Sequence, residues 1–118
     1  MEQGKSTDMV AEVREYIEKY PDGIRAMYAD LRALIMESAP AGVEEVLWAK
    51  LPSYYLKERF VRLIPFKDHI NIEAAGLLEY AGQLSAHRFT PRGMLQLYTG
   101  GAIPADMLKM AFKATFSA

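Results

Sequence analysis

The chain has 118 residues, of which 51% are hydrophobic and 25% charged, as in an ordinary globular domain, and we expect one domain over residues 1–118. It contains no cysteine, which excludes disulfides and thiolate chemistry. No stretch approaches the roughly 18 apolar residues of a membrane span, and the first residues lack the apolar run of a signal peptide. We therefore expect a cytoplasmic protein without a membrane partner.

The net charge of −1 conceals an asymmetry along the chain. Residues 1–45 hold ten acidic and five basic side chains, whereas residues 46–118 hold five acidic and nine basic ones. A nearly neutral total lacks the basic footprint of nucleic-acid-binding proteins, so we expect no nucleic-acid partner. The split predicts an acidic N-terminal element beside a mildly basic remainder, with two ordinary solvated faces as the alternative.

Two amphipathic helices are predicted at the start of the chain. Residues 6–8 offer Ser, Thr and Asp as N-caps for the first helix, which carries apolar residues at helical spacing as far as Tyr20. The segment Pro21-Asp22-Gly23 ends it, and a second helix with an i, i+3, i+4, i+7 apolar stripe follows until Ser38. The stripe contains Ile24, Met27, Tyr28, Leu31, Leu34 and Ile35. So short a connection predicts an antiparallel helical hairpin.

The middle of the chain is typical of strands joined by short turns. An apolar segment over residues 44–51 is interrupted at Pro52-Ser53 and resumes at 54–56, before a polar tip at 57–59. Further strands are predicted at residues 60–66 and 69–73. Because the connections are too short for parallel crossovers, an antiparallel meander is predicted.

The last third of the chain returns to helical patterns. Residues 74–84 are predicted to be helical despite two glycines, residues 85–93 to be a loop, and residues 94–98 to be a short strand. Pro104 suits the first position of a final helix, whose buried stripe contains Met107, Leu108, Ala111, Phe112 and Phe116. Amphipathic helices need an apolar sheet face to cover. The predicted fold is therefore α+β, with an antiparallel sheet of four to five strands packed against an N-terminal helical hairpin and a C-terminal helix.

The segment RLIPFKDHINIE, residues 62–73, predicts a hairpin with a two-residue turn at Lys67-Asp68. This register pairs Phe66 with His69, and it places on one face Arg62, Ile64, Phe66, His69, Asn71 and Glu73. The opposite face is wholly apolar, with Val61, Leu63, Pro65, Ile70 and Ile72. The apolar face should be covered by helices, whereas the mixed face is the predicted wall of a pocket. An ordinary solvent-exposed sheet face is the alternative.

Basic and aromatic residues near this mixed face suggest a site for a small polar or anionic ligand. Cations from the hairpin tip and from the loop before the last strand would surround a space walled by aromatic rings, including one of Tyr54 or Tyr55. The candidate residues are Trp48, Lys50, Tyr54, Arg62, Phe66, Lys67, His69, Arg92, Gly93 and Gln96. Basic residues scattered over the surface are the alternative.

Other kinds of chemistry have less support. Asp8, Glu12 and Glu15 could form an acidic stripe on the first helix, and hard cations such as iron accept oxygen ligands. Arg14 and Lys19 are interleaved with these carboxylates, as on an ordinary solvated helix face. The two histidines lack the spacing of a zinc site, and no serine lies in a nucleophile elbow. We therefore expect no enzyme and no bound cofactor, with iron as the one exception.

Four segments of the chain resemble the YdhG-like family, a bacterial group of small domains. They are VREYIEKYPDGIRAMYADLRALIMESAP, EEVLWAKLPSYYL, RLIPFKDHINIE and RFTPRGMLQLYTGGAIPADMLKMAFKATF. The family positions are Trp48, Lys50, Phe66, Lys67, His69, Arg92, Gly93 and Gln96, and no catalytic role comes with them. The resemblance implies a frataxin-like α+β domain, and a member of the family is labelled an intracellular iron chaperone. The chain departs from the family at Lys57-Glu58-Arg59, where a glycine is usual, and at Leu97-Tyr98, where Phe-Pro is usual.

Three hypotheses about function follow. The leading one is a non-enzymatic binding domain in which Lys67, Arg92 and His69 contact a small ligand between Trp48 and Phe66. The second is an iron chaperone that uses the carboxylates of the first helix. The third is a protein-interaction module, such as a homodimer, that uses exposed aromatic residues such as Tyr54 or Tyr98.

Overall fold

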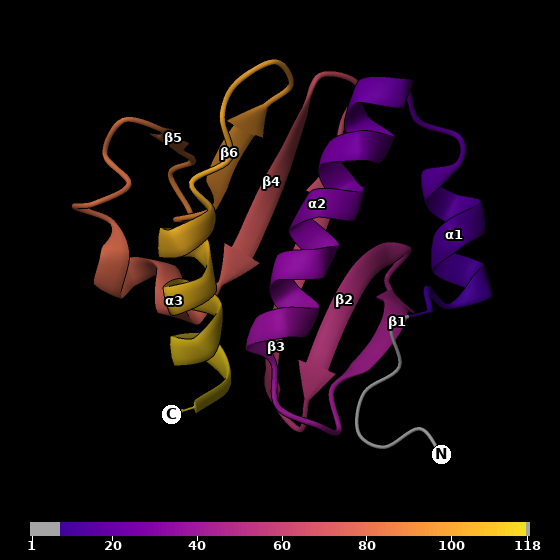
Figure 1. Cartoon of the computed structure of the whole chain (residues 1–118), viewed down its shortest axis with the longest axis horizontal. Helices are drawn as coiled ribbons and strands as arrows, with labels where there is room; N and C mark the ends of the chain where they lie inside the picture. Colours follow the sequence, from indigo (N-terminus) through magenta and orange to yellow (C-terminus); the bar gives the residue numbers. More distant parts are fainter. Residues whose placement is uncertain (1–7, 118) are drawn as a thin grey trace.

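A single antiparallel sheet with helices on one of its faces makes up the protein, whose computed structural model describes residues 8–117 (Figure 1). The elements in chain order are α1 (Ala11–Ile17), α2 (Asp22–Ser38), β1 (Glu44–Trp48), β2 (Leu51–Leu56), β3 (Arg59–Pro65), β4 (His69–Ala74), the 3₁₀ helix η1 (Ala75–Tyr80), β5 (Arg88–Phe89), β6 (Leu95–Tyr98) and α3 (Ala105–Ser117). The strand order is β1-β2-β3-β4-β6-β5. The predicted α+β class is confirmed, with six strands instead of four to five. The additional strand, β5, is too short to give a period-2 pattern in the sequence.

The helices form a layer over one face of the sheet (Figure 1). Helices α2 and α3 cover its middle, while α1 runs antiparallel to α2 and packs on β1 at the edge. The predicted stripes of α2 and α3 are buried except for Leu34 and Met107, which are partly buried against the core. The predicted cap of α1 is wrong for Asp8, because the helix begins after Val10, and Ser6 and Thr7 lie outside the described residues. In place of a side-chain cap, the backbone N–H of Val10 donates to Glu45 Oε1 at 2.8 Å. None of the described helices is long and apolar enough to cross a membrane.

The first hairpin differs from its prediction. The turn lies at Ala49 and Lys50, which both have positive φ angles of 52° and 68°, and β2 runs straight through Pro52. Pro52 pairs with Leu47 of β1, whereas the pairing of β2 with β3 begins one residue later, at Ser53. The missing N–H of proline therefore removes no ladder hydrogen bond on the β3 side, which is why the proline does not interrupt the strand.

The second predicted hairpin is confirmed. Arg62 pairs with Glu73, and the Phe66 backbone N–H donates to the His69 carbonyl at 2.8 Å across the two-residue turn. The predicted apolar face lies under the helices, and its residues are all buried. This register leaves the opposite face of the sheet, which we call the open face, without a helix over it (Figure 1).

The segment after β4 is only partly helical, since the predicted helix over residues 74–84 is reduced to η1 followed by turns. The backbone of Gly76 in η1 touches α3: its N–H donates to Thr115 Oγ1 at 2.8 Å, and Thr115 Oγ1 donates to the Ala111 carbonyl at 2.8 Å. Pro104 precedes the first residue of α3 instead of occupying it, and its carbonyl accepts from the Leu108 N–H.

Candidate functional site

Arg62 is the centre of the open face. Its Nε donates to Ser53 Oγ at 2.9 Å, and its two terminal nitrogens reach Tyr55 Oη at 2.6 Å and Glu73 Oε1 at 3.1 Å. The guanidinium also lies 4.1 Å from the ring centre of Trp48, and Arg62 as a whole is only 5% exposed. A charge this well paired and covered stabilises the sheet, and its hydrogen-bonding groups are already engaged. Arg62, predicted to bind a ligand, is therefore placed as a structural residue.

A row of stacked rings lies on the open face, with Phe66 from the turn after β3, His69 from β4 and Tyr98 from β6. His69 lies between Phe66 and Tyr98, with ring centres 4.4 and 4.7 Å away, and its Nδ1 is 2.8 Å from Asp68 Oδ1. Phe66 and Tyr98 are 43% and 42% exposed, and Trp48 on the same face is 51% exposed. We call Trp48, Phe66, His69 and Tyr98 the aromatic patch.

Three other predicted ligand residues, Tyr54, Gln96 and Lys50, lie in different places in the structure. Tyr54 was placed wrongly, because its side chain is fully buried on the helix side while Tyr55 lies on the open face. Gln96 pairs with Asn71 on the open face, and Lys50 lies in the turn between β1 and β2. The residue types in the sequence could not decide between the two tyrosines, because the position of the following turn sets which one faces inward.

Lys67 and Arg92 do not come together. Lys67 lies in the turn before His69, which pairs with Tyr98, whereas Arg92 lies just before β6, near the rung that joins Ile72 and Leu95. The intervening rungs span roughly 10 Å along the strands. The predicted pair of cations over one ligand is therefore not formed, and Arg92 belongs to a different part of the surface.

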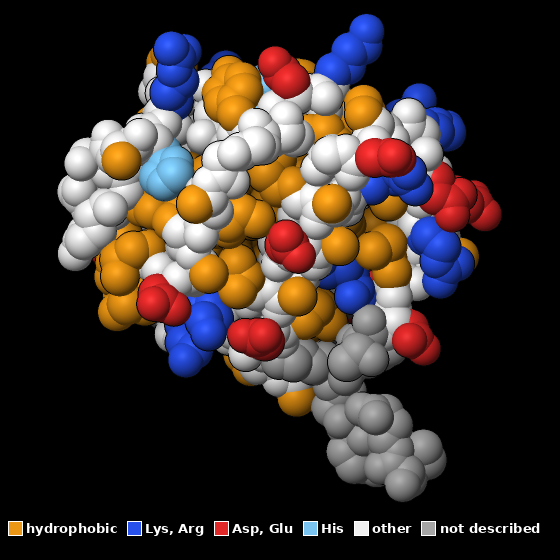
Figure 2. Space-filling view, turned by 45° about the horizontal axis from the view of Figure 1, so that its top comes forward, with side chains coloured by type: hydrophobic (Ala, Val, Ile, Leu, Met, Phe, Trp, Pro, Cys, Tyr) orange, Lys and Arg blue, Asp and Glu red, His pale blue; other side chains and the backbone are white. Residues whose placement is uncertain are grey.

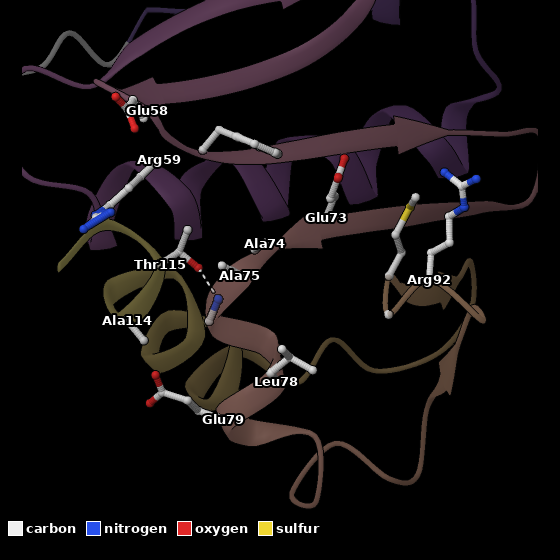
Figure 3. A pocket seen from close by; sticks show the side chains of 14 residues that line it. Glu58, Arg59, Glu73, Ala74, Ala75, Leu78, Glu79, Arg92, Ala114 and Thr115 are labelled. Carbon is white, nitrogen blue, oxygen red and sulfur yellow. Dashed lines mark hydrogen bonds between the residues drawn. The ribbon is translucent and has the colours of Figure 1, made fainter. Parts of the chain in front are cut away.

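Arg92 borders a cavity of about 530 Å³ at the end of the sheet where β3 begins and β4 ends (Figure 3). It is lined by the start of β3 and the turn before it, the end of β4, η1, the turn before β6 and the last turns of α3. Its apolar wall includes Phe60, Leu78 and Met94, and Leu78 is 80% exposed. The sequence could not show this cavity, because its walls come from segments far apart in the chain.

Charged groups lie on two sides of this cavity. Arg92 and Glu73 are on one side, and Glu58, Arg59 and Glu79 are on the other (Figure 3). Arg92 forms no ion pair with any residue that the structure describes. Gly93 has a φ angle of 87°, which turns the chain at the cavity rim and favours glycine there. An unengaged guanidinium beside an apolar wall can hold a carboxylate or phosphate by paired hydrogen bonds.

A buried polar network between α2 and β1 was missed by the sequence analysis. Glu45 Oε2 accepts from Arg32 Nε at 2.6 Å and from the Tyr54 hydroxyl at 2.7 Å, and Tyr54 also bonds to Tyr28. Since Tyr54 gives its proton to Glu45, Tyr28 donates to Tyr54. The signal was present, because Arg32 lies four residues after Tyr28, on the buried stripe of α2. A charge on that stripe requires a partner of opposite charge.

Burial raises the pKa of Tyr28 and of Tyr54 above the ordinary tyrosine value. Below about pH 10 tyrosine is protonated in both the folded and the unfolded chain, so pH has no effect through these groups. Above that pH the unfolded chain releases protons that the folded protein keeps, and stability falls. We expect the free energy of unfolding to decrease between pH 10 and pH 11 by about 1 kcal/mol per tyrosine involved.

Urea unfolding at pH 8, 10 and 11 measures this decrease. The Tyr28→Phe variant provides the comparison, because it retains one of the two buried hydroxyls and should lose stability less steeply with pH. Equal free energies of unfolding at pH 8 and pH 11 would contradict the expectation.

The predicted metal ligands lie on the exposed surface of the first helix and of the segment before it. Asp8, Glu12 and Glu15 are all exposed, and no group of three or more His, Cys, Asp or Glu side chains within residues 8–117 is arranged to hold a metal ion. Figure 2 shows acidic side chains interspersed with basic ones over the helix layer, including the side that carries α1. This is the pattern of a solvated helix face.

No family model matches the chain, and neither the curated proteins nor the solved structures contain a match to it. The resemblance to the YdhG-like family therefore stays a prediction, and so does any function that it implies.

Proposed function

We propose that the protein is a non-enzymatic binding domain for a small anionic ligand, which it holds in the cavity beside Arg92. The observation that carries the proposal is an unengaged arginine at the rim of a 530 Å³ cavity with an apolar wall. Cavities of this size are typical of small-molecule sites, where a few polar groups fix the orientation of a largely apolar ligand. Of the residues predicted from the sequence, the proposed site includes Arg92 and Gly93 but not Lys67.

The arrangement favours a ligand with two features. A carboxylate or phosphate would accept hydrogen bonds from Arg92, and an apolar body would cover Leu78 and Met94. Glu73 gives one oxygen to Arg62, and its side chain is 39% exposed, so it can also accept from an ammonium or hydroxyl group of the ligand. Small amphipathic acids, including amino acids, fit this description.

A titration followed by ¹⁵N–¹H NMR tests the proposal, with phenylacetate, leucine and phenyl phosphate as probes. We expect at least one probe to shift the amide signals of Gly76, Gly93 and Met94 in a saturable way. Arg92→Gln should weaken that binding about tenfold or more, because a hydrogen bond to a charged group contributes about 1.5–3 kcal/mol. Its melting temperature should stay unchanged, since the side chain is exposed.

Arg88→Gln is the matched control, because Arg88 is an exposed arginine on β5 that does not line the cavity. It should leave the affinity unchanged. The proposal fails if none of the three probes binds, or if Arg88→Gln and Arg92→Gln weaken binding equally.

The two other hypotheses stay predictions with direct tests. An iron chaperone should bind ferrous iron saturably under anaerobic conditions and lose that binding when Asp8, Glu12 and Glu15 are all replaced by alanine. A homodimer should show twice the monomer mass by light scattering. We also propose a cytoplasmic location, which fractionation of cells that express the protein would test.

A further inference from the structure

We propose that the aromatic patch is a docking surface for an acidic segment of another protein. This surface is independent of the cavity, because the patch lies at the opposite end of the open face, beside the turns before β2 and β4. Its rings are exposed, they are held rigidly, and positive charges surround them.

The aromatic patch groups several large exposed apolar side chains on one face of the sheet. Trp48 is in β1, Phe66 directly follows β3 and Tyr98 is in β6, and each exposes more than two fifths of its surface on one face of the sheet. Half-buried Leu51 and Ile64 lie on the same face and extend the apolar area. Single exposed apolar residues are ordinary, whereas a contiguous group of this kind marks an interaction site. Aromatic side chains are also the residues that contribute most to binding energy at interfaces.

The rings of the patch are already held in place. Phe66, His69 and Tyr98 stack on one another, and Trp48 lies over the guanidinium of Arg62, which is itself fixed by its hydrogen bonds to Ser53 and Glu73. Side chains that are fixed before binding lose little rotamer entropy when a partner covers them. A preorganised patch can therefore bind a short segment with useful affinity.

The charges around the patch determine the chemistry of the partner. Lys50 and Lys67 lie in the two adjoining turns, and neither forms an ion pair with a residue that the structure describes. Arg88 belongs to the same face, because it pairs with Gln96. Asp68, beside Lys67 in the same turn, contacts His69 Nδ1 and is 71% exposed, so it offsets one of these three positive charges. The excess charge at this end is positive, which complements acidic side chains of a partner.

A protein segment fits this surface better than a nucleic acid. The whole chain has a net charge of −1, and its N-terminal part is acidic, so it lacks the extended basic footprint that binds a phosphate backbone. A few lysines at the rim of an apolar patch suit a segment that combines carboxylates with one or two large apolar anchors.

A phage-displayed library of random 12-residue peptides tests the proposal with the full chain as bait. We expect enriched peptides to combine Asp or Glu with Trp, Phe or Leu, and their binding to shift the amide signals of His69 and Tyr98. The double variant Lys50→Glu/Lys67→Glu should weaken them about tenfold, because both rim charges become repulsive. Tyr98→Ala should also weaken them about tenfold, because it removes an exposed aromatic anchor.

Lys57→Glu is the matched control, because Lys57 is also an exposed turn lysine with a positive φ angle, at the other end of the sheet. It should leave the affinity of the enriched peptides unchanged. The proposal is overturned if no peptide is enriched, if Lys57→Glu weakens binding as much as the double variant, or if the patch binds a fluorescent dT12 oligonucleotide and none of the peptides.

Discussion

Replacing Gly76 by alanine is expected to lower the free energy of unfolding by about 3 kcal/mol or more. A Cβ atom built at Gly76 would lie 2.1 Å from the Ala111 carbonyl oxygen and 2.9 Å from the Thr115 backbone nitrogen. Both obstacles belong to the backbone of α3, so no side-chain rotation can relieve the clash. The helix would have to move away from η1, which would break the buried hydrogen bond between the Gly76 N–H and Thr115. Urea unfolding of both proteins measures the difference.

Gly82→Ala is the matched control, because a Cβ atom at Gly82 meets nothing within 4 Å. The same substitution should change stability by less than about 0.5 kcal/mol there, or raise it slightly through the unfolded chain. Stability of Gly76→Ala equal to that of Gly82→Ala would show that α3 and η1 can separate without cost. Thr115→Val isolates the hydrogen bond from the clash and should cost about 1–3 kcal/mol, because it leaves the buried Gly76 N–H without its acceptor.

These two glycines show how far local patterns predict this fold. In the sequence, Gly76 and Gly82 are equivalent weaknesses of one helix, whereas in the structure one is a contact point between two elements and the other lies in a turn. The hairpin over residues 62–73 was predictable because alternation of apolar and polar residues fixes its register locally. The close approach of η1 to α3 depends on a contact between Gly76 and Thr115, which are 39 positions apart in the chain. A pattern of neighbouring residues cannot predict such a contact.

In the candidate site, too, locally determined features were predictable and features that depend on the strand order were not. The open face and its pairs follow from strand alternation, and Phe66, His69 and Gln96 are found there as expected. The separation of Lys67 from Arg92 was not predictable, because it depends on which strand neighbours β4 and in which direction that strand runs. Of the residues that line the cavity, the sequence pointed only to Arg92 and Gly93. Other parts of the lining come from η1 and α3, which are distant from them in the sequence.

The largest electrostatic effect is expected from Glu45→Ala, which should lower the free energy of unfolding by about 3–5 kcal/mol. The Glu45 side chain is 4% exposed and accepts hydrogen bonds from Arg32, Tyr54 and the Val10 backbone N–H. Its removal takes away the carboxylate that accepts hydrogen bonds from Arg32 Nε at 2.6 Å and from Arg32 Nη2 at 3.1 Å in a largely buried ion pair. Glu44→Ala, at the neighbouring exposed position, is the control and should change stability by less than about 0.5 kcal/mol.

Hydrogen exchange distinguishes two consequences of the Glu45 substitution. Glu45 is also the side chain that holds the start of α1, through the Val10 N–H at 2.8 Å. We therefore expect the amides of α1, including those of buried Val13 and Ile17, to exchange faster in Glu45→Ala than the global loss of stability explains. A double-mutant cycle with Arg32→Ala measures the coupling between the two charges, and we expect it to exceed about 1 kcal/mol. A cost below about 1 kcal/mol for Glu45→Ala, or α1 exchange that only follows global unfolding, would mean that Val13 and Ile17 alone hold α1 against the sheet.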